Sequence, residues 1–416
     1  MFSRYKHLEK PVVFVIIAEF FIQLIDYSYM SILMVFMTKV GYADYQAADF
    51  YGYRFLSVLL FSFYLGFYIN GRKLKPLFYI SAILTPLISV GIIYAVEYKI
   101  DLLVYSGMFM MGIAVLGLEV SVLPYILRNV DEEYHSEAIS LSYSTISLSG
   151  IISGITIYTL SAINHEFFDA QTILKIISVF CLAGVFFIYA NKKQEFYVPI
   201  LRRSRYDFRD IKWKLIVNAT IPTLLMATGA GLIIPFMGIF FYKVHNLDED
   251  KFALLSAITT FIVFSLTLYV PNIRQKLGYK TTILGSQSLA IACLLGLSLT
   301  EFFSMYHYTI LIAIMCFILR QPLMNIAMPI TSDITMKYVG FRHRELMSAI
   351  TAAVWSGSWF FSTNIFKVLR KHEVPYAYIF FITAMMYILS IAWYFYLIAA
   401  YEKKTAEEAE LKKIKK

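Results

Sequence analysis

Twelve apolar stretches, each long enough to cross a lipid bilayer, occupy almost the whole chain. A membrane-spanning helix needs about 20 apolar residues, because the hydrocarbon core is about 30 Å thick and a helix rises about 1.5 Å per residue. In lipid each backbone N–H and C=O must be hydrogen-bonded within its own segment, so each stretch is expected to be an α-helix. The stretches lie near residues 11–38, 49–69, 76–96, 102–127, 137–161, 171–191, 215–241, 252–271, 281–300, 309–335, 346–366 and 376–400.

The positive charges predict how these spans are oriented. An even number of spans places both termini on one side, and 27 of the 37 lysines and arginines fall in the segments of that side, against 7 in the opposite loops. The positive-inside rule therefore predicts cytoplasmic N- and C-termini. The net charge of +9 follows from this asymmetry, so no nucleic-acid partner is needed to explain it.

The spans divide into two sets of six around a basic segment. We expect an N-terminal six-helix bundle over residues 1–191, a cytoplasmic linker over 192–214, a C-terminal bundle over 215–400 and a charged tail over 401–416. The linker carries several arginines beside apolar residues, which is typical of a segment lying on anionic lipid headgroups. A regulatory role for the linker is the alternative.

The second set of six spans repeats landmarks of the first. Pro124 and Pro329 are 205 residues apart, and Glu137 and Glu345, which each open a span rich in small residues, are 208 apart. Short basic loops also follow the second and the eighth span. Offsets of this kind are what tandem six-helix halves produce when an axis along the membrane normal relates them.

These basic loops carry a resemblance to the major facilitator superfamily, which covers about residues 10–400. Residues 71–73, Gly-Arg-Lys, resemble the end of the signature G-x-x-x-D-R-x-G-R-R, and residues 276–280 resemble its counterpart in the second half. The acidic residue of the signature has no equivalent here, since residues 60–75 and 265–280 contain no Asp or Glu. The fifth span also lacks the Gly-Pro signature of many drug antiporters, which disfavours a drug exporter.

The resemblance implies a fold and a mechanism. The fold is all-α, with twelve transmembrane helices in two six-helix bundles related by pseudo-twofold symmetry. In this superfamily spans 1, 4, 7 and 10 line a central cleft, and the bundles rock about it to open each side in turn. Transport by alternating access is therefore the expected activity.

Acidic residues in the first and fourth spans are candidates for proton coupling. Glu19, Gln23 and Asp26 are spaced i, i+4 and i+7, which puts them on one face of a helix. Glu119 lies in the fourth span, five residues before Pro124. A carboxyl group away from water holds its proton more tightly, so it can load on one side and release on the other. The alternative is that these carboxylates are paired or hydrogen-bonded structural groups.

Arg320 lies near the middle of the tenth span and cannot be neutralised. It is expected to bind a carboxylate or phosphate of the substrate, to pair across the cleft with Glu19, Asp26 or Glu119, or to serve a structural role within the C-terminal bundle. Further substrate-binding candidates are polar residues of three spans. They are Gln23 in the first span, Asn218 and Thr223 in the seventh, and Gln321 and Asn325 in the tenth. Acids in one half and a cation in the other suggest protons on one bundle and an anionic substrate on the other.

Arg54, in the second span, is expected to form a structural or gating ion pair with Asp26 or Asp49. The three cysteines all fall in apolar spans and show no metal-ligand spacing. No nucleotide-binding or hydrolase motif is present in the sequence, so neither an enzyme nor a cofactor is expected.

The sequence therefore predicts a proton-coupled secondary transporter, and its substrate is expected to be a small organic solute with an anionic group. The transporter is expected to work as a monomer in a prokaryotic inner membrane. Its expected partners are the solute, protons and anionic lipids. An exporter of amphipathic drugs or a lipid flippase is one alternative, although charges in the cleft count against it. A transporter-like sensor or scaffold is an alternative of another class.

Overall fold

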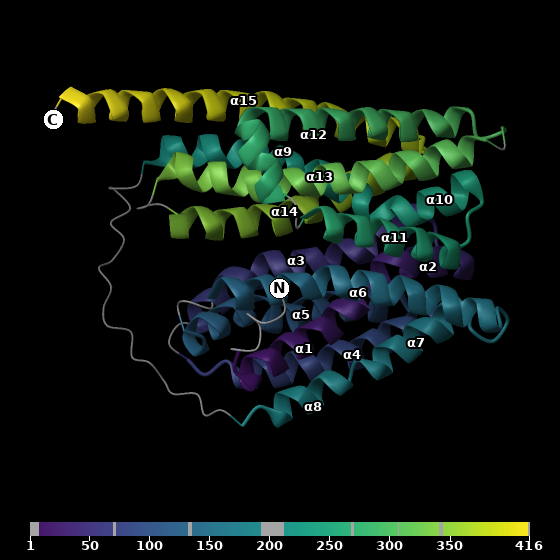
Figure 1. Ribbon diagram of the computed structural model, residues 1–416. Helices are drawn as coiled ribbons and strands as arrows, with labels where there is room; N and C mark the ends of the chain where they lie inside the picture. The colour runs from purple at the N-terminus through teal and green to yellow at the C-terminus, as the bar shows by residue number, and fades with distance from the viewer. Residues whose placement is uncertain are drawn as a thin grey trace. The chain divides into compact units, whose positions relative to one another are not determined.

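The computed structural model describes residues 8–69, 72–131, 135–192, 212–267, 270–306, 308–340 and 344–414, and these residues are almost entirely α-helical without a β-strand (Figure 1). They form two compact units. The first comprises Met1–Arg203, Pro235–Phe261 and Phe366–Lys371, and the second comprises Ser204–Ile234, Ile262–Ile365 and His372–Lys416.

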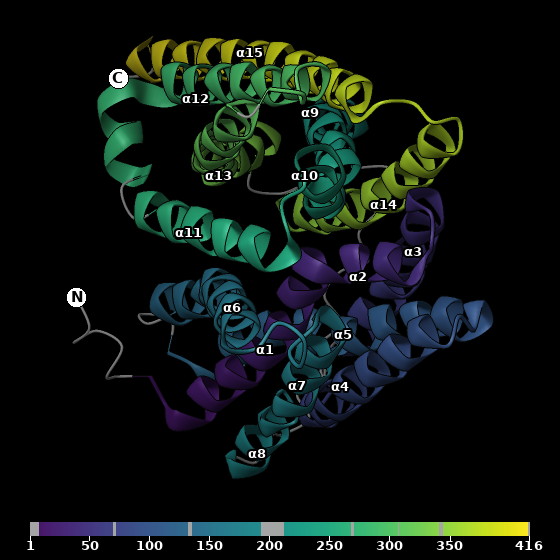
Figure 2. The ribbon, with the colours of Figure 1, turned by 90° about the vertical axis from the view of Figure 1, so that its right-hand side faces the viewer.

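The first unit is built around α1 (Lys10–Ser28), which packs against α4, α5, α6, α7 and α8 (Figure 2). A π-helical turn (Tyr29–Leu33) joins α1 to α2. The remaining helices of this unit are α2 (Met34–Val40), α3 (Asp44–Ile69), α4 (Lys75–Glu97), α5 (Asp101–Asn129), α6 (His135–Ile163), α7 (Ala170–Phe180), α8 (Ala183–Ala190), α10 (Met237–His245) and most of α11 (Glu249–Thr267).

The second unit contains α9 (Trp213–Ile233), α12 (Val270–Phe302), α13 (Thr309–Val339), α15 (Tyr376–Ile414) and most of α14 (Arg344–Lys371). Its helix α12 packs against α13 and α15, and α9 packs against both α15 and α13. Both ribbon views show α12 beside α15. Buried aliphatic side chains such as Ile283, Ile330 and Leu397 form its core.

Nine helical segments of the described chain are long and apolar enough to cross a membrane, which makes the protein a multi-pass membrane protein. The predicted spans 49–69, 252–271 and 346–366 are not among the nine. The first and the last of these lie within helices α3 and α14, and α11 covers 252–267 of the second. The count of twelve spans and the pseudo-twofold symmetry therefore remain predictions.

The predicted division into two bundles also remains a prediction, because residues Pro235–Phe261 and Phe366–Lys371 group with the first unit. Most of the predicted linker, residues 193–211, lies outside the described residues. The predicted tail continues α15 as far as Ile414.

The repeat extends to local backbone structure. The π-helical turn between α1 and α2 begins at Tyr29. A 3₁₀ turn between α9 and α10 begins at Ile234, 205 residues later. The residues that follow the next two helices, Gly41 (φ 105°) and Asn246 (φ 51°), are again 205 residues apart, and each has the left-handed conformation that Gly and Asn adopt most readily. The offset equals that of Pro124 and Pro329. A break in the α-helix and a left-handed cap therefore recur at this offset, although the first break is a π-turn and the second a 3₁₀ turn.

Close packing of α5 on α3 yields a testable prediction. A Cβ atom at Gly112 would lie 2.0 Å from Ser57 Oγ and 2.4 Å from the Arg54 carbonyl oxygen. We expect Gly112→Ala to force the helices apart and to destabilise the protein by about 1–3 kcal/mol. Gly91→Ala is the control, because a Cβ there meets nothing within 4 Å, and alanine favours a helix over glycine by up to about 1 kcal/mol. Thermal unfolding in detergent measures both, and equal stability of the two variants would contradict this packing.

Candidate functional site

Two polar residues of α1 are hydrogen-bonded to α6. Glu19 Oε2 accepts from Ser142 Oγ at 2.6 Å, and one turn further along Gln23 Oε1 accepts from Thr145 Oγ1 at 2.6 Å. Glu19 is 8% exposed. Charged or polar groups without such partners are costly away from water, so these two bonds fix the face of α1 that α6 meets.

The third polar residue of α1 pairs with α3. Asp26 Oδ2 lies 2.6 Å from Arg54 Nη2, and Arg54 Nη1 donates to the Tyr51 hydroxyl at 3.3 Å. Asp26 Oδ1 is buried and has no hydrogen-bond partner among the described atoms. Of the two partners predicted for Arg54, the structure therefore gives Asp26. Asp49 accepts instead from Tyr105 and pairs with Lys367 at 2.7 Å.

Glu119 on α5 completes a charged group within the first unit. It interacts electrostatically with Glu19, Asp26 and Arg54, and unlike Glu19 its side chain is exposed. We call Glu19, Asp26, Glu119 and Arg54 the acid cluster. Three carboxylates share one guanidinium there, so full ionisation would leave a net charge of −2. The charges of this cluster therefore do not balance among its own four side chains.

The second unit holds the other candidates. Arg320 on α13 is 2% exposed, and its Nη2 donates to the Tyr387 hydroxyl on α15 at 3.4 Å. Asn325 donates to the backbone carbonyl of Gln321, a local bond within α13. The Asn218 carbonyl accepts from Trp393, and Thr223 interacts with the Tyr394 hydroxyl. The structure thus places Thr223 in the interior of this unit, beside α15.

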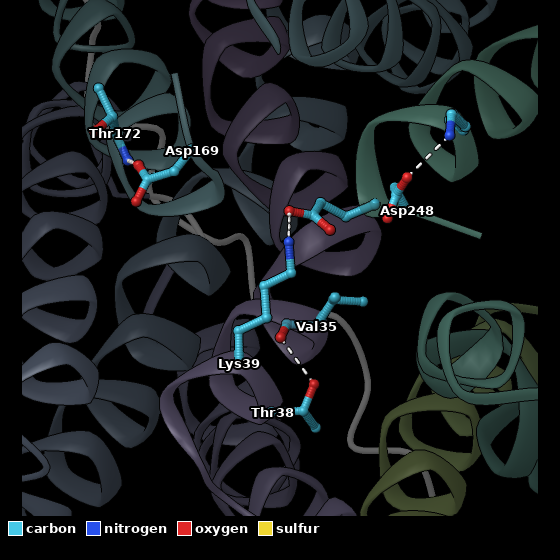
Figure 3. A network of polar contacts seen from close by, with 8 residues as sticks. Val35, Thr38, Lys39, Asp169, Thr172 and Asp248 are labelled. Atoms are coloured by element: carbon cyan, nitrogen blue, oxygen red, sulfur yellow. Dashed lines mark hydrogen bonds and ion pairs between the residues drawn. The ribbon is translucent and has the colours of Figure 1, made fainter. Parts of the chain in front are cut away.

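Ion pairs of the first unit join the turn between α2 and α3 to the turn between α10 and α11. Lys39 Nζ, at the end of α2, lies 2.5 Å from Glu249 Oε1 at the start of α11. Figure 3 labels Lys39 and marks this ion pair with a dashed line. Lys243 in α10 pairs with Asp44 at the start of α3, and Arg370 reaches the same carboxylate at 3.1 Å. Both carboxylates are only 5% exposed.

These pairs are reciprocal within the repeat. Asp44 and Glu249 are 205 residues apart, and Lys39 and Lys243 are 204 apart. The lysine of each predicted half therefore pairs with the acid of the other. We call Lys39–Glu249 and Lys243–Asp44 the reciprocal ion pairs. By contrast, the nearby Asp248 pairs locally with Lys251 at 2.9 Å (Figure 3).

The same end of the first unit carries a further hydrogen bond. The Tyr42 hydroxyl, in the turn after α2, donates to Asp101 Oδ1 at 2.8 Å. Burial, together with this bond, raises the pKa of Tyr42, so the hydroxyl keeps its proton and the bond persists at physiological pH.

A comparison with protein families decides the classification. The family model described as Major Facilitator Superfamily matches residues 15–363. The chain belongs to the Major Facilitator Superfamily. No curated protein matches this facilitator in sequence.

Solved structures of transporters share the fold of this facilitator. A nucleoside transporter, NupG, matches with a TM-score of 0.73 at 12% identity, covering 94% of this chain and 99% of that one. A POT family transporter in complex with a thioalcohol-conjugated peptide matches with a TM-score of 0.72 at 12% identity, covering 94% and 96%. A bacterial homologue of the lysosomal transporter Spinster matches with a TM-score of 0.67 at 11% identity, covering 93% and 96%. At these identities the likeness concerns the fold alone.

Several residues of this facilitator's site were not predicted from the sequence. In the sequence, Ser142 and Thr145 are two of many small residues in the fifth span, and Tyr387 is one of many aromatic residues, so nothing marks them as partners of charged groups. The reciprocal ion pairs had a usable signal, because Asp44 and Glu249 share the 205-residue offset of the proline pair.

The Asp26–Arg54 pair predicts a non-additive mutational effect. Asp26→Asn leaves the buried guanidinium of Arg54 without its closest anion, and we expect it to lower the free energy of unfolding by about 3 kcal/mol. Adding Arg54→Met removes the orphaned charge and should recover part of the loss. Thermal unfolding of the two single variants and the double variant measures this, and strictly additive effects would argue against the pair.

The reciprocal ion pairs predict a charge-swap rescue. Lys39→Glu places two acids together and should destabilise the protein by about 1 kcal/mol, a modest value because the lysine is 37% exposed. Lys39→Glu combined with Glu249→Lys should restore the melting temperature. Lys251→Glu, opposite Asp248, is the matched control and should have a smaller effect. Failure of the swap to recover stability would contradict the pairing.

Proposed function

We propose that this facilitator is a proton-coupled secondary transporter that moves a small anionic organic solute by alternating access. The observation that carries the proposal is the acid cluster, in which Glu19, Asp26 and Glu119 share the single cation Arg54. A cluster with excess negative charge in an apolar bundle binds a proton readily and releases it when its surroundings change.

Glu119 is assigned the exchange of protons with water. It is the exposed member of the cluster, and in this superfamily the fourth span faces the cleft. Protonation of Asp26 would weaken its bond to Arg54 and free the guanidinium to turn toward Glu119. Binding of the proton would thus allow α1 to move against α3, which couples protonation to a conformational change.

The reciprocal ion pairs are assigned the closure of one side of the pathway. They join the turn after α2 to the start of α11, and the turn after α10 to the start of α3. Opening of that side requires both pairs to break, and the π-helical and 3₁₀ turns that precede α2 and α10 provide places where the helices can bend.

The proposal includes the surroundings of the protein. We place both termini in the cytoplasm on the asymmetry of lysine and arginine. The short loops of the opposite side favour a prokaryotic inner membrane. A monomer is proposed because each chain is expected to hold a complete transport pathway. The basic linker is assigned to anionic lipid headgroups. The charged groups of the acid cluster favour a polar solute over a lipid or an amphipathic drug.

Proton flux in reconstituted liposomes tests the coupling. Purified protein is reconstituted with a pH-sensitive dye inside, and acetate, benzoate, dipeptides, nucleosides and amino acids are added outside in turn. We expect at least one solute to change the internal pH faster than in protein-free liposomes, which take up acetic and benzoic acid passively, and Glu19→Gln, Asp26→Asn or Glu119→Gln to abolish that difference.

Glu97→Gln is the matched control for these variants, because Glu97 lies at the end of α4 and pairs with Lys175 rather than with the acid cluster. Its proton flux should equal that of the wild type. Solute uptake without any pH change, or full proton flux in all three cluster variants, would overturn the coupling. A lipid analogue and a hydrophobic cation are added to the same liposomes as further probes, and activity with these alone would favour the flippase or drug exporter instead.

A further inference from the structure

Arg320 is a buried cation without an anionic partner among the described residues. It is 2% exposed, and the one hydrogen bond that it makes to a described residue is the long contact from Nη2 to the Tyr387 hydroxyl at 3.4 Å. Its Nε is buried and has no acceptor in the described part of the chain. This positive charge lies in apolar surroundings, where it needs an anion or several acceptors.

The described carboxylates of the second unit do not balance this charge. Asp333 lies on the same helix thirteen residues further along, a rise of about 20 Å. Glu301, near the end of α12, accepts from the backbone N–H of Ala377. No described carboxylate lies within ion-pair distance of Arg320. A buried charge left unpaired costs several kcal/mol, so the site favours binding of an external anion.

The free donors of this site match a carboxylate group. Nε–H and Nη2–H lie along one edge of the guanidinium, and that edge can bind both oxygens of a carboxylate at once. The Tyr387 hydroxyl beside Nη2 adds a donor from α15. Gly229 on α9 allows the ring this position, because a Cβ there would lie 2.7 Å from the Tyr387 ring.

The charge of the site selects among anions. Arg320 is the one lysine or arginine in the apolar stretches 215–241, 281–300, 309–335, 346–366 and 376–400. One positive charge balances one negative charge, whereas a phosphate dianion or a dicarboxylate would bring an uncompensated charge into the bundle. A monocarboxylate therefore fits better than either.

We infer that Arg320 and Tyr387 form the binding site for the single carboxylate group of the transported solute. The inference rests on the proposed function in that the bound anion is the cargo, and it adds the chemical class, a monocarboxylate. It also adds Tyr387, on α15, to the residues that contact the substrate.

Thermal unfolding of the full-length protein in detergent tests the site. The probes are sodium benzoate, acetate, succinate, phosphate and chloride at matched ionic strength, with benzamide as the uncharged analogue of benzoate. A ligand that binds only the folded protein raises its melting temperature. We expect benzoate and acetate to raise it by several degrees and benzamide to leave it unchanged.

Variants identify the groups responsible. Arg320→Met should abolish the benzoate shift, and Tyr387→Phe should weaken benzoate binding by about fivefold, the effect of one lost hydrogen bond. Arg320→Lys retains the positive charge, so we expect this variant to fold. It lacks the edge with two donors, so it should bind benzoate about tenfold more weakly. Lys280→Met is the control, because Lys280 lies over the Phe395 ring elsewhere in the same unit, and its shift should match the wild type.

Three results would overturn the inference. An undiminished benzoate shift in Arg320→Met would place the anion elsewhere. A shift with chloride equal to that with benzoate would indicate a resident inorganic anion rather than a carboxylate. A larger shift with phosphate or succinate would refute selection by a single charge. Binding is measured without proton flux, so a protein that binds benzoate but moves no protons would retain this site and lose only the proposed coupling.

Discussion

Charge in an apolar helix bundle must be compensated, and this requirement shapes both units of the protein. In the first unit Asp26 pairs with Arg54, the carboxylate of Glu19 accepts a hydrogen bond from Ser142, and the neutral amide of Gln23 accepts one from Thr145. Each of these contacts also ties α1 to a neighbouring helix, so the polar groups determine which faces of α1 meet α3 and α6. In the second unit no described residue meets the same requirement at Arg320, and this is the ground on which we infer a ligand there.

The two kinds of charged site differ in what they can do. The acid cluster has more negative charge than positive charge and is therefore suited to bind protons. Arg320 has a positive charge that cannot be removed and is suited to bind an anion. The assignment of protons to one half of the chain and of an anionic solute to the other thus rests on the chemistry of the residues present in each.

The sequence was informative where a pattern depends on the membrane or on the repeat. Apolar stretches predicted helices, because lipid permits little else. The spacing of Glu19, Gln23 and Asp26 predicted that they share one face of a helix, and in the structure Glu19 and Gln23 bond to α6 whereas Asp26 pairs with α3. It could not predict that Ser142 and Thr145 would meet this face, since hydroxyl residues are abundant in the fifth span. It also left Arg54 with two possible partners, because the choice between Asp26 and Asp49 depends on how α1 and α3 rotate against each other. The partner of Arg320 within its own unit, Tyr387, was hidden among 32 tyrosines.

The reciprocal ion pairs have a consequence for how that end of the first unit can separate. A contact in which residue i of one copy meets residue j of another, while j of the first meets i of the second, is the pattern of a symmetric dimer. Lys39–Glu249 and Lys243–Asp44 follow this pattern closely, although the acids are 205 residues apart and the lysines 204. Two similar bonds of this kind resist separation about equally, so neither side of the contact is favoured to open first.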